Sequence, residues 1–197
     1  MAAAMTMVAA AVSGCALLTA RHDPAQVTSG LYRVDPDHTE VNWSVSHFGF
    51  TEFQGRFDTV SGTLRLDPGS GAADQLDIRI ETASINTPSH ALNTELASVA
   101  WFDAASYPAV TFHSTAVAGT GPGTARVTGD LTLHGVTRPL TLDVRFVGAG
   151  LNPLSGAYTA GFAATGTLNR ADFGIAKLLP AIGDSVTLTL AGAFERS

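Results

Sequence analysis

Side chains that could perform metal, nucleophilic or phosphate chemistry are scattered in this sequence. The six histidines stand at positions 22, 38, 47, 90, 113 and 134, and no two of them have the spacing of metal ligands on a strand or a helix. Two glycine-rich pieces, 69–71 and 119–123, border strand-like runs but open no helix, so they indicate turns rather than phosphate-binding loops. No nucleophile motif is present. We therefore expect no catalytic residues and no metal site, and the residues argue against an enzyme.

Two polar residues, His47 and Arg170, fall on strand faces that are otherwise apolar. His47 ends the alternating run Val41–His47, and Arg170 ends the run Tyr158–Arg170. Successive strand side chains point to opposite sides, so both residues share a side with hydrophobic neighbours. Each is either a barrel-end residue whose polar tip reaches water while its body packs, or a contact for the polar head of a ligand near an opening. Both readings stay open at this point.

A third reactive residue, Cys15, is the only cysteine, so an intrachain disulfide is excluded. It lies within the uncharged, apolar stretch Met1–Ala20, which is marginal as a spanning helix and lacks the basic start of an export signal. The tetrad Val12-Ser13-Gly14-Cys15 resembles a bacterial lipobox. We expect residues 1–20 to be an export or lipoprotein signal with Cys15 lipidated; cleavage without lipidation and a retained anchor are the alternatives.

Residues 21–30 are polar and carry no periodicity, which predicts a tether between this signal and the folded domain. A tether of roughly 15 residues from Cys15 could reach at most about 50 Å. The remaining segment, 31–197, is expected to be one domain, because a chain of 197 residues with 45% hydrophobic residues can bury one substantial core. The net charge of -6 argues against nucleic acid and against an anionic membrane as partners.

Period-two alternation recurs along this domain and predicts antiparallel strands. After a short strand at 31–35, eight longer runs follow: Glu40–His47, Gly55–Asp67, Gln75–Ser84, Ala109–Val117, Thr124–Leu133, Pro139–Val147, Tyr158–Arg170 and Ser185–Glu195. We expect loops at 48–54 and 148–156, and a bulge near Asp58–Thr59. One helix is predicted, at His90–Ala100. The fold expected is therefore an all-β, eight-stranded antiparallel, lipocalin-like barrel with one short helix at its mouth.

Six motifs in this order resemble the YceI-like family. They are Tyr32-Arg33-Val34-Asp35, Val41–Gly49, Gly55-Arg56-Phe57, Pro108–Ser114, Gly129–Leu140 and Asn169–Ile175, with His38-Thr39, Gly62-Thr63-Leu64 and Gly161-Phe162 between them. The resemblance implies a lipocalin-like barrel, secreted or periplasmic in bacteria, that binds polyisoprenoid lipids such as quinones or isoprenyl phosphates. The chain departs from the family in having Asn93 and Glu95 before Leu96 and Trp101 where Phe is common, which puts any head-group contact from the helix in doubt.

The expected ligand contacts are the residues of the inner strand faces and of the helix end. They are Trp43, Val45, His47, Phe57, Leu64, Ile78, Trp101, Phe102, Phe112, Leu131, Leu142, Phe146, Phe162, Ala164, Leu168, Arg170 and Phe173. The small residues Ala160, Ala164 and Gly166 are expected to leave room in the lumen. A solid core is the alternative.

These observations favour an isoprenoid carrier or sequestering protein of the bacterial cell envelope. No covalent cofactor is expected, and the partner would be an apolar long-chain small molecule, an isoprenoid quinone or an isoprenyl lipid. A possible lipid anchor would keep the protein near a membrane, in the periplasm or cell envelope. An envelope stress or accessory scaffold without a lipid ligand, and an enzyme acting on an isoprenoid, are the competing hypotheses. The oligomeric state is left open.

Overall fold

The computed structural model describes residues 20–68 and 74–197. Its strands are β1 (Gly30–Val34), β2 (Glu40–His47), β3 (Thr51–Phe57), β4 (Val60–Leu66), β5 (Gln75–Glu81), β6 (Ile85–Asn86), β7 (Ala109–Gly121), β8 (Thr124–Leu133), β9 (Val136–Leu151), β10 (Tyr158–Asn169) and β11 (Ile182–Arg196). The helices are α1 (His90–Ala97) and the short 3-10 helices η1 (Pro24–Gln26), η3 (Thr82–Ser84) and η4 (Arg170–Phe173). In the described part of the chain, no helix is long and apolar enough to cross a membrane.

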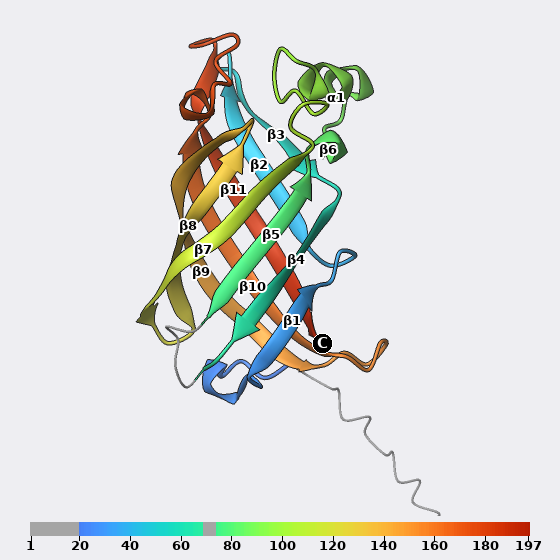
Figure 1. Cartoon of the computed structure of the whole chain (residues 1–197), viewed down its shortest axis with the longest axis vertical. Coiled ribbons are helices and arrows are strands. Elements are labelled where there is room, and N and C mark those ends of the chain that lie inside the picture. The colour runs from blue at the N-terminus through green and yellow to red at the C-terminus, as the bar shows by residue number, and fades with distance from the viewer. Residues whose placement is uncertain (1–19, 69–73) are drawn as a thin grey trace, which may run out of the picture.

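Eight strands close into an antiparallel barrel (Figure 1). The order is β1-β4-β5-β7-β8-β9-β10-β11, and β1 closes the ring by pairing with both β4 and β11. Because β1 pairs with a strand on each side, the ring has no unpaired strand edge where β1 lies. The prediction of an eight-stranded antiparallel barrel with one helix is confirmed, although the short first strand, which we had not counted, is the one that completes it.

The strands β2 and β3 extend the barrel at one end instead of closing it. β11 pairs with β1 only through Phe194–Arg196, whereas its long N-terminal part, Ile182–Ala191, pairs with β2. The prediction of a single strand at 55–67 is therefore wrong. The chain forms two strands that are separated at Asp58–Thr59, because β3 pairs with β2 and β6 while β4 pairs with β1 and β5. A change of partners, and not a bulge, bends the chain here.

Two expected loops are shorter than predicted, because their residues join strand ladders. The loop at 48–54 shrinks to 48–50, since Thr51–Gln54 pair with β2. The loop at 148–156 loses its first residues, since Gly148–Leu151 pair with β10. The helix expected to reach Ala100 ends at Ala97, where the Ser98 hydroxyl donates to the Glu95 carbonyl at 2.6 Å. The helix begins at His90, as predicted. Ser89 caps this end, because its hydroxyl accepts from the Leu92 N–H at 3.3 Å.

Residues 21–30 lie against the barrel end opposite α1, so the expected free tether is corrected. Arg21 and Ala149 exchange two backbone hydrogen bonds of 2.8 and 2.9 Å. The Asp23 carboxylate then accepts from the Ala25 N–H at 3.0 Å and starts η1. Paired backbone groups of this kind hold a polar segment in place without hydrophobic periodicity. Cys15 and the rest of the predicted signal lie outside the described residues.

Candidate ligand cavity

The barrel encloses a cavity of about 360 Å³, within the usual range of about 300–1,000 Å³ for small-molecule sites. Side chains from the inner faces of the strands, from α1 and from the segment after η4 line it. The lining is almost entirely aliphatic and aromatic. Of the described residues that line the cavity, four are ionisable: Glu40, His47, Asp74 and Arg170.

The structure brings together nearly all of the ligand contacts expected from the sequence. The cavity is lined by Trp43, Val45, His47, Phe57, Leu64, Ile78, Trp101, Phe102, Phe112, Leu131, Leu142, Phe162, Ala164, Leu168 and Arg170. Phe146 and Phe173 are not among the lining residues. Phe146 stacks edge-on against Phe162 at 5.6 Å, and Phe173 is 2% exposed within the core. The alternation also placed further lining residues on inner strand faces, although they were not among the expected contacts: Ile80, Val127, Leu133, Leu140, Leu188 and Leu190. Ile182, which lines the cavity too, precedes the strand expected at 185–195.

A second hydrophobic cluster lies at the end of the cavity away from α1. We call this cluster the plug; its buried members are Tyr32, Leu64, Ala149, Ala160 and Phe194, with Phe146, Tyr158 and Phe162 packed against them. Ala160 is 0% exposed, so it leaves no room for a ligand. The space expected over Gly166 is also absent, because a Cβ there would lie 2.7 Å from Leu142 Cδ2. Of the three small residues singled out in the sequence, only Ala164 faces the cavity.

Arg170 holds the segment that follows η4. Its Nε donates to the Gly183 carbonyl at 2.8 Å, Nη1 to the Ile175 and Lys177 carbonyls at 2.8 and 3.0 Å, and Nη2 to the Ile182 carbonyl at 2.8 Å. The residue is 5% exposed, so the reading in which its tip reaches water is wrong. Burial lowers the pKa of the guanidinium, with an opposing effect from Asp184. Four of its five N–H groups already have acceptors, so Arg170 is mainly an anchor of this segment.

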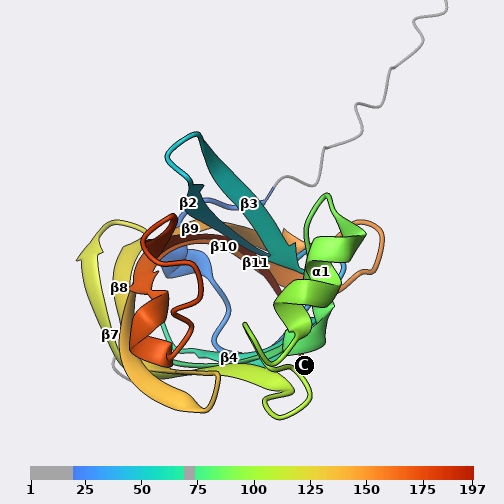
Figure 2. The same cartoon turned by 90° about the horizontal axis from the view of Figure 1, so that it is seen from above.

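We call the end of the barrel that carries α1 the mouth; Leu92, Leu96 and Trp101 line the cavity there, and Figure 2 shows α1 beside the ring of strands at this end. His47 lies there, half-buried, with its ring 4.6 Å from that of Phe48 and 5.8 Å from that of Phe53. In the sequence, this residue had two open readings. The structure places it on the lining, between the rings of Phe48 and Phe53.

A polar bridge crosses the mouth from α1 to the segment after η4. Glu95 accepts from Trp101 Nε1 at 3.0 Å and from Lys177 Nζ at 2.5 Å. The Lys177 ammonium lies 5.5 Å from the centre of the Trp101 ring, and the Arg170 guanidinium lies 5.6 Å from it. The hydrogen bond from Lys177, followed by that from Trp101, lowers the pKa of Glu95. Glu95 and Trp101, two of the three residues at which the sequence departs from the pattern it resembles, therefore contact each other at the mouth.

The remaining charges of the lining are carboxylates farther from the mouth. Asp74 precedes β5 and accepts from the Asp67 N–H at 2.6 Å, and burial raises its pKa. Glu40 accepts from Asn42 Nδ2 at 3.0 Å. Within residues 20–68 and 74–197, no group of three or more His, Cys, Asp or Glu could hold a metal ion. The cavity thus offers apolar contact along its length, with negative rather than positive charge near its far end.

Comparison with known proteins agrees with this architecture. A family model described as a YceI-like domain matches residues 32–194. The chain belongs to the YceI-like family. A UPF0312 protein of Pseudomonas savastanoi pv. phaseolicola is 40% identical over 189 residues, which cover 95% of this chain and 94% of the relative. A UPF0312 protein of Vibrio parahaemolyticus is 37% identical over 173 residues, covering 88% and 89%.

Solved structures of other proteins share the barrel. BcnA of Burkholderia cenocepacia has a TM-score of 0.74 at 26% identity, covering 81% of this chain and 98% of that one. The YceI protein of Campylobacter jejuni has a TM-score of 0.69 at 26% identity, covering 77% and 90%. A polyisoprenoid binding domain from Saccharophagus degradans has a TM-score of 0.60 at 18% identity, covering 86% and 100%, which shows a common fold. The family resemblance seen in the sequence motifs is confirmed.

Proposed function

We propose that this protein binds a polyisoprenoid lipid in the barrel and carries or sequesters it in the bacterial cell envelope, without catalysing a reaction. The observation that supports this most is the long apolar cavity, which runs from the mouth to the plug inside a YceI-like barrel. The related fold of the Saccharophagus degradans polyisoprenoid binding domain points to the same class of ligand.

The energetics of an apolar lining favour a ligand of several isoprene units. Burying one five-carbon unit contributes about 4 kcal/mol, at about 0.8 kcal/mol per methylene-sized group. Association costs about 4–15 kcal/mol, and micromolar affinity requires a net value of about -8 kcal/mol. Between about three and about six buried units therefore suffice.

The charges of the lining favour a neutral head group, such as a quinone, over an isoprenyl phosphate. A phosphate needs unoccupied cationic donors, because burying an unpaired ion costs several kcal/mol. The one permanent cation of the lining is Arg170, whose donors are mostly taken by backbone carbonyls. Glu40 and Asp74 would repel a phosphate.

Two tryptophans, Trp43 and Trp101, report on the cavity, because both line it and the sequence contains no others. A benzoquinone with a farnesyl tail should quench their fluorescence saturably. Farnesol and farnesyl phosphate, added as competitors, differ only in the head group, and we expect the phosphate to displace the quinone at least tenfold less well. Absence of saturable quenching would contradict the apolar-ligand function. Displacement of the quinone by farnesyl phosphate at lower concentrations than farnesol would contradict the preference for a neutral head group.

We further propose that the protein is exported and that Cys15 is its lipidation site. The proposal rests on the tetrad Val12-Ser13-Gly14-Cys15 behind an apolar N-terminal stretch. Since Arg21 is paired with Ala149, five residues separate Cys15 from the barrel, and this stretch reaches at most about 20 Å. Cys15→Ser should move the protein from the membrane fraction to the soluble fraction. Retention in the membrane fraction after this change would refute lipidation as the means of attachment.

A further inference from the structure

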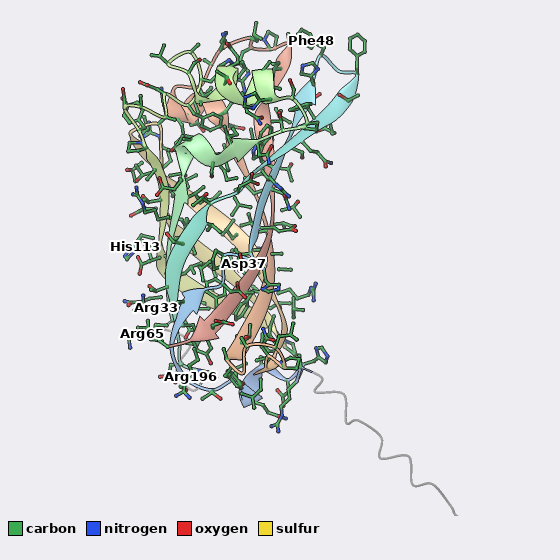
Figure 3. All side chains as sticks on the ribbon, turned by 90° about the vertical axis from the view of Figure 1, so that its right-hand side faces the viewer. Arg33, Asp37, Phe48, Arg65, His113 and Arg196 are labelled. Atoms are coloured by element: carbon green, nitrogen blue, oxygen red, sulfur yellow. The ribbon has the colours of Figure 1, made fainter. Side chains whose placement is uncertain are left out.

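The mouth of the cavity carries a set of exposed hydrophobic side chains that no part of the described chain covers. We call this set the rim: Phe48, Phe50, Leu178 and Leu179, which are 49%, 87%, 49% and 36% exposed. Figure 3 shows Phe48 at one extreme of the barrel and Arg196 toward the other. The Phe48 N–H donates to the Ala181 carbonyl at 2.7 Å, which joins the two segments that contribute the rim.

Backbone geometry holds the rim in its exposed arrangement. Phe48 and Leu178 have φ values of 53° and 61°, in the left-handed region that bulky side chains seldom adopt. Each is fixed by hydrogen bonds: Phe50 N–H donates to the His47 carbonyl at 3.0 Å, and Ile182 N–H to the Leu178 carbonyl at 2.9 Å. Strained residues persist where the surrounding structure fixes them, and they concentrate at functional sites. The outward display of these side chains is therefore a built feature of the mouth.

The rim continues into the lining of the cavity. The Phe48 ring lies against His47, and His47 lies against Phe53; both His47 and Phe53 line the cavity. On the other segment, Ile182 lines the cavity next to the rim leucines. An apolar chain that leaves a membrane at the rim would thus pass over hydrophobic surface all the way to the lumen.

We propose that the rim inserts into the surface of a lipid bilayer, so that the cavity opens directly to it. This bilayer is not the one that would hold an acyl chain on Cys15, because such an anchor lies at the opposite end of the barrel. Insertion of the rim rests on the proposed function, because an apolar ligand of this cavity would come from a membrane. Hydrophobic insertion, and not charge attraction, drives the contact: the net charge is -6, and the single lysine, Lys177, is paired with Glu95. The segment Arg21–Gln26 packs at the opposite end and leaves the mouth uncovered (Figure 1).

Orientation on the membrane can be measured with a tryptophan placed at either end. Leu154 is 94% exposed in the β9–β10 loop, at the end opposite the mouth, so it is a matched control for Phe50. Both variants, Phe50→Trp and Leu154→Trp, are made in the full chain carrying Cys15→Ser, which removes any acyl anchor. With phosphatidylcholine vesicles that contain brominated acyl chains, we expect quenching of the added fluorescence in Phe50→Trp alone. Quenching in Leu154→Trp, or in neither variant, would overturn the proposal.

Affinity for the vesicles supplies a second test. Removing one Phe from the bilayer surface should weaken vesicle binding about tenfold or more, so Phe50→Ser should lose at least this much and Leu154→Ser should lose nothing. Equal binding by the two variants would contradict membrane insertion at the rim. A dimer that dissociates in Phe50→Ser, without quenching by vesicles, would assign the rim to a second copy and refute the proposal.

Failure of this proposal is separable from failure of the proposed function. Quinone quenching of Trp43 and Trp101 is measured in solution without vesicles. Saturable quinone binding together with no vesicle contact at the rim would refute membrane docking and leave the ligand assignment in place.

Discussion

The substitution Ala164→Phe places a phenyl ring at the wall of the cavity. Ala164 lies on β10 between Val144 of β9 and Leu190 of β11, and all three side chains line the lumen. The six ring carbons are comparable with one isoprene unit, so filling this space removes up to about 4 kcal/mol of ligand burial. A ligand that shifts toward the mouth recovers part of this loss, and we expect affinity for the farnesyl quinone to fall at least tenfold.

The same ring should not destabilise the unliganded protein. On folding, the phenyl ring moves from water into an apolar cavity. This transfer raises the free energy of unfolding by up to about 2 kcal/mol. Ala160→Phe is the matched control, because Ala160 lies four residues away on the same strand face but is packed within the plug. Overpacking there should cost about 1–3 kcal/mol.

Thermal unfolding and quinone titration of both variants provide the assay. We expect Ala164→Phe to keep or raise Tm while quinone affinity falls, and Ala160→Phe to lower Tm. A loss of stability in Ala164→Phe as large as that in Ala160→Phe, with unchanged quinone affinity, would refute the reasoning. The barrel would then have a solid core at this level.

Three other substitutions test the mouth and the wall. Arg170→Met should lower stability by about 3–5 kcal/mol in denaturant unfolding, because it leaves buried carbonyls without donors; a change confined to ligand affinity would contradict its anchoring role. Glu95→Gln should remove a pH dependence of Trp101 fluorescence. Because the pKa of Glu95 is lowered in the folded protein, the ionised carboxylate holds the bridge above the ordinary pKa of 4.5, and the bridge is lost as the pH falls through the lower pKa of the folded state. Gly55→Ala should shift the emission of Trp43, whose ring a Cβ at this position would strike; unchanged emission would show that the ring does not lie there.

Alternation predicted the fold and the lining because both depend on which side of a strand a residue occupies. Trp43, Phe112 and Leu142 face the lumen for the same reason that their neighbours face water. The break at Asp58–Thr59 was missed because it follows from a change of pairing partners, and pairing is a long-range property. The fixed position of residues 21–30 was missed because backbone hydrogen bonds to β9 leave no hydrophobic pattern in the sequence.

The detailed chemistry of the candidate site was less predictable than its position. Arg170 was placed on the correct face, but its carbonyl acceptors belong to a segment whose path periodicity does not determine. Small residues were interpreted as free space, yet the space beside Gly166 is filled by a side chain from the neighbouring strand. Whether a small residue leaves a void depends on its cross-strand neighbours, and register is needed to identify them.

The most direct test of lipid carriage is native mass spectrometry of the protein purified from its host without harsh detergent. We predict a bound apolar species whose mass and fragmentation correspond to a neutral isoprenoid, and the loss of most of it in Ala164→Phe. A barrel that remains empty after gentle purification would contradict the account and favour a scaffold. A bound species that the protein converts to a product would contradict it as well and identify an enzyme.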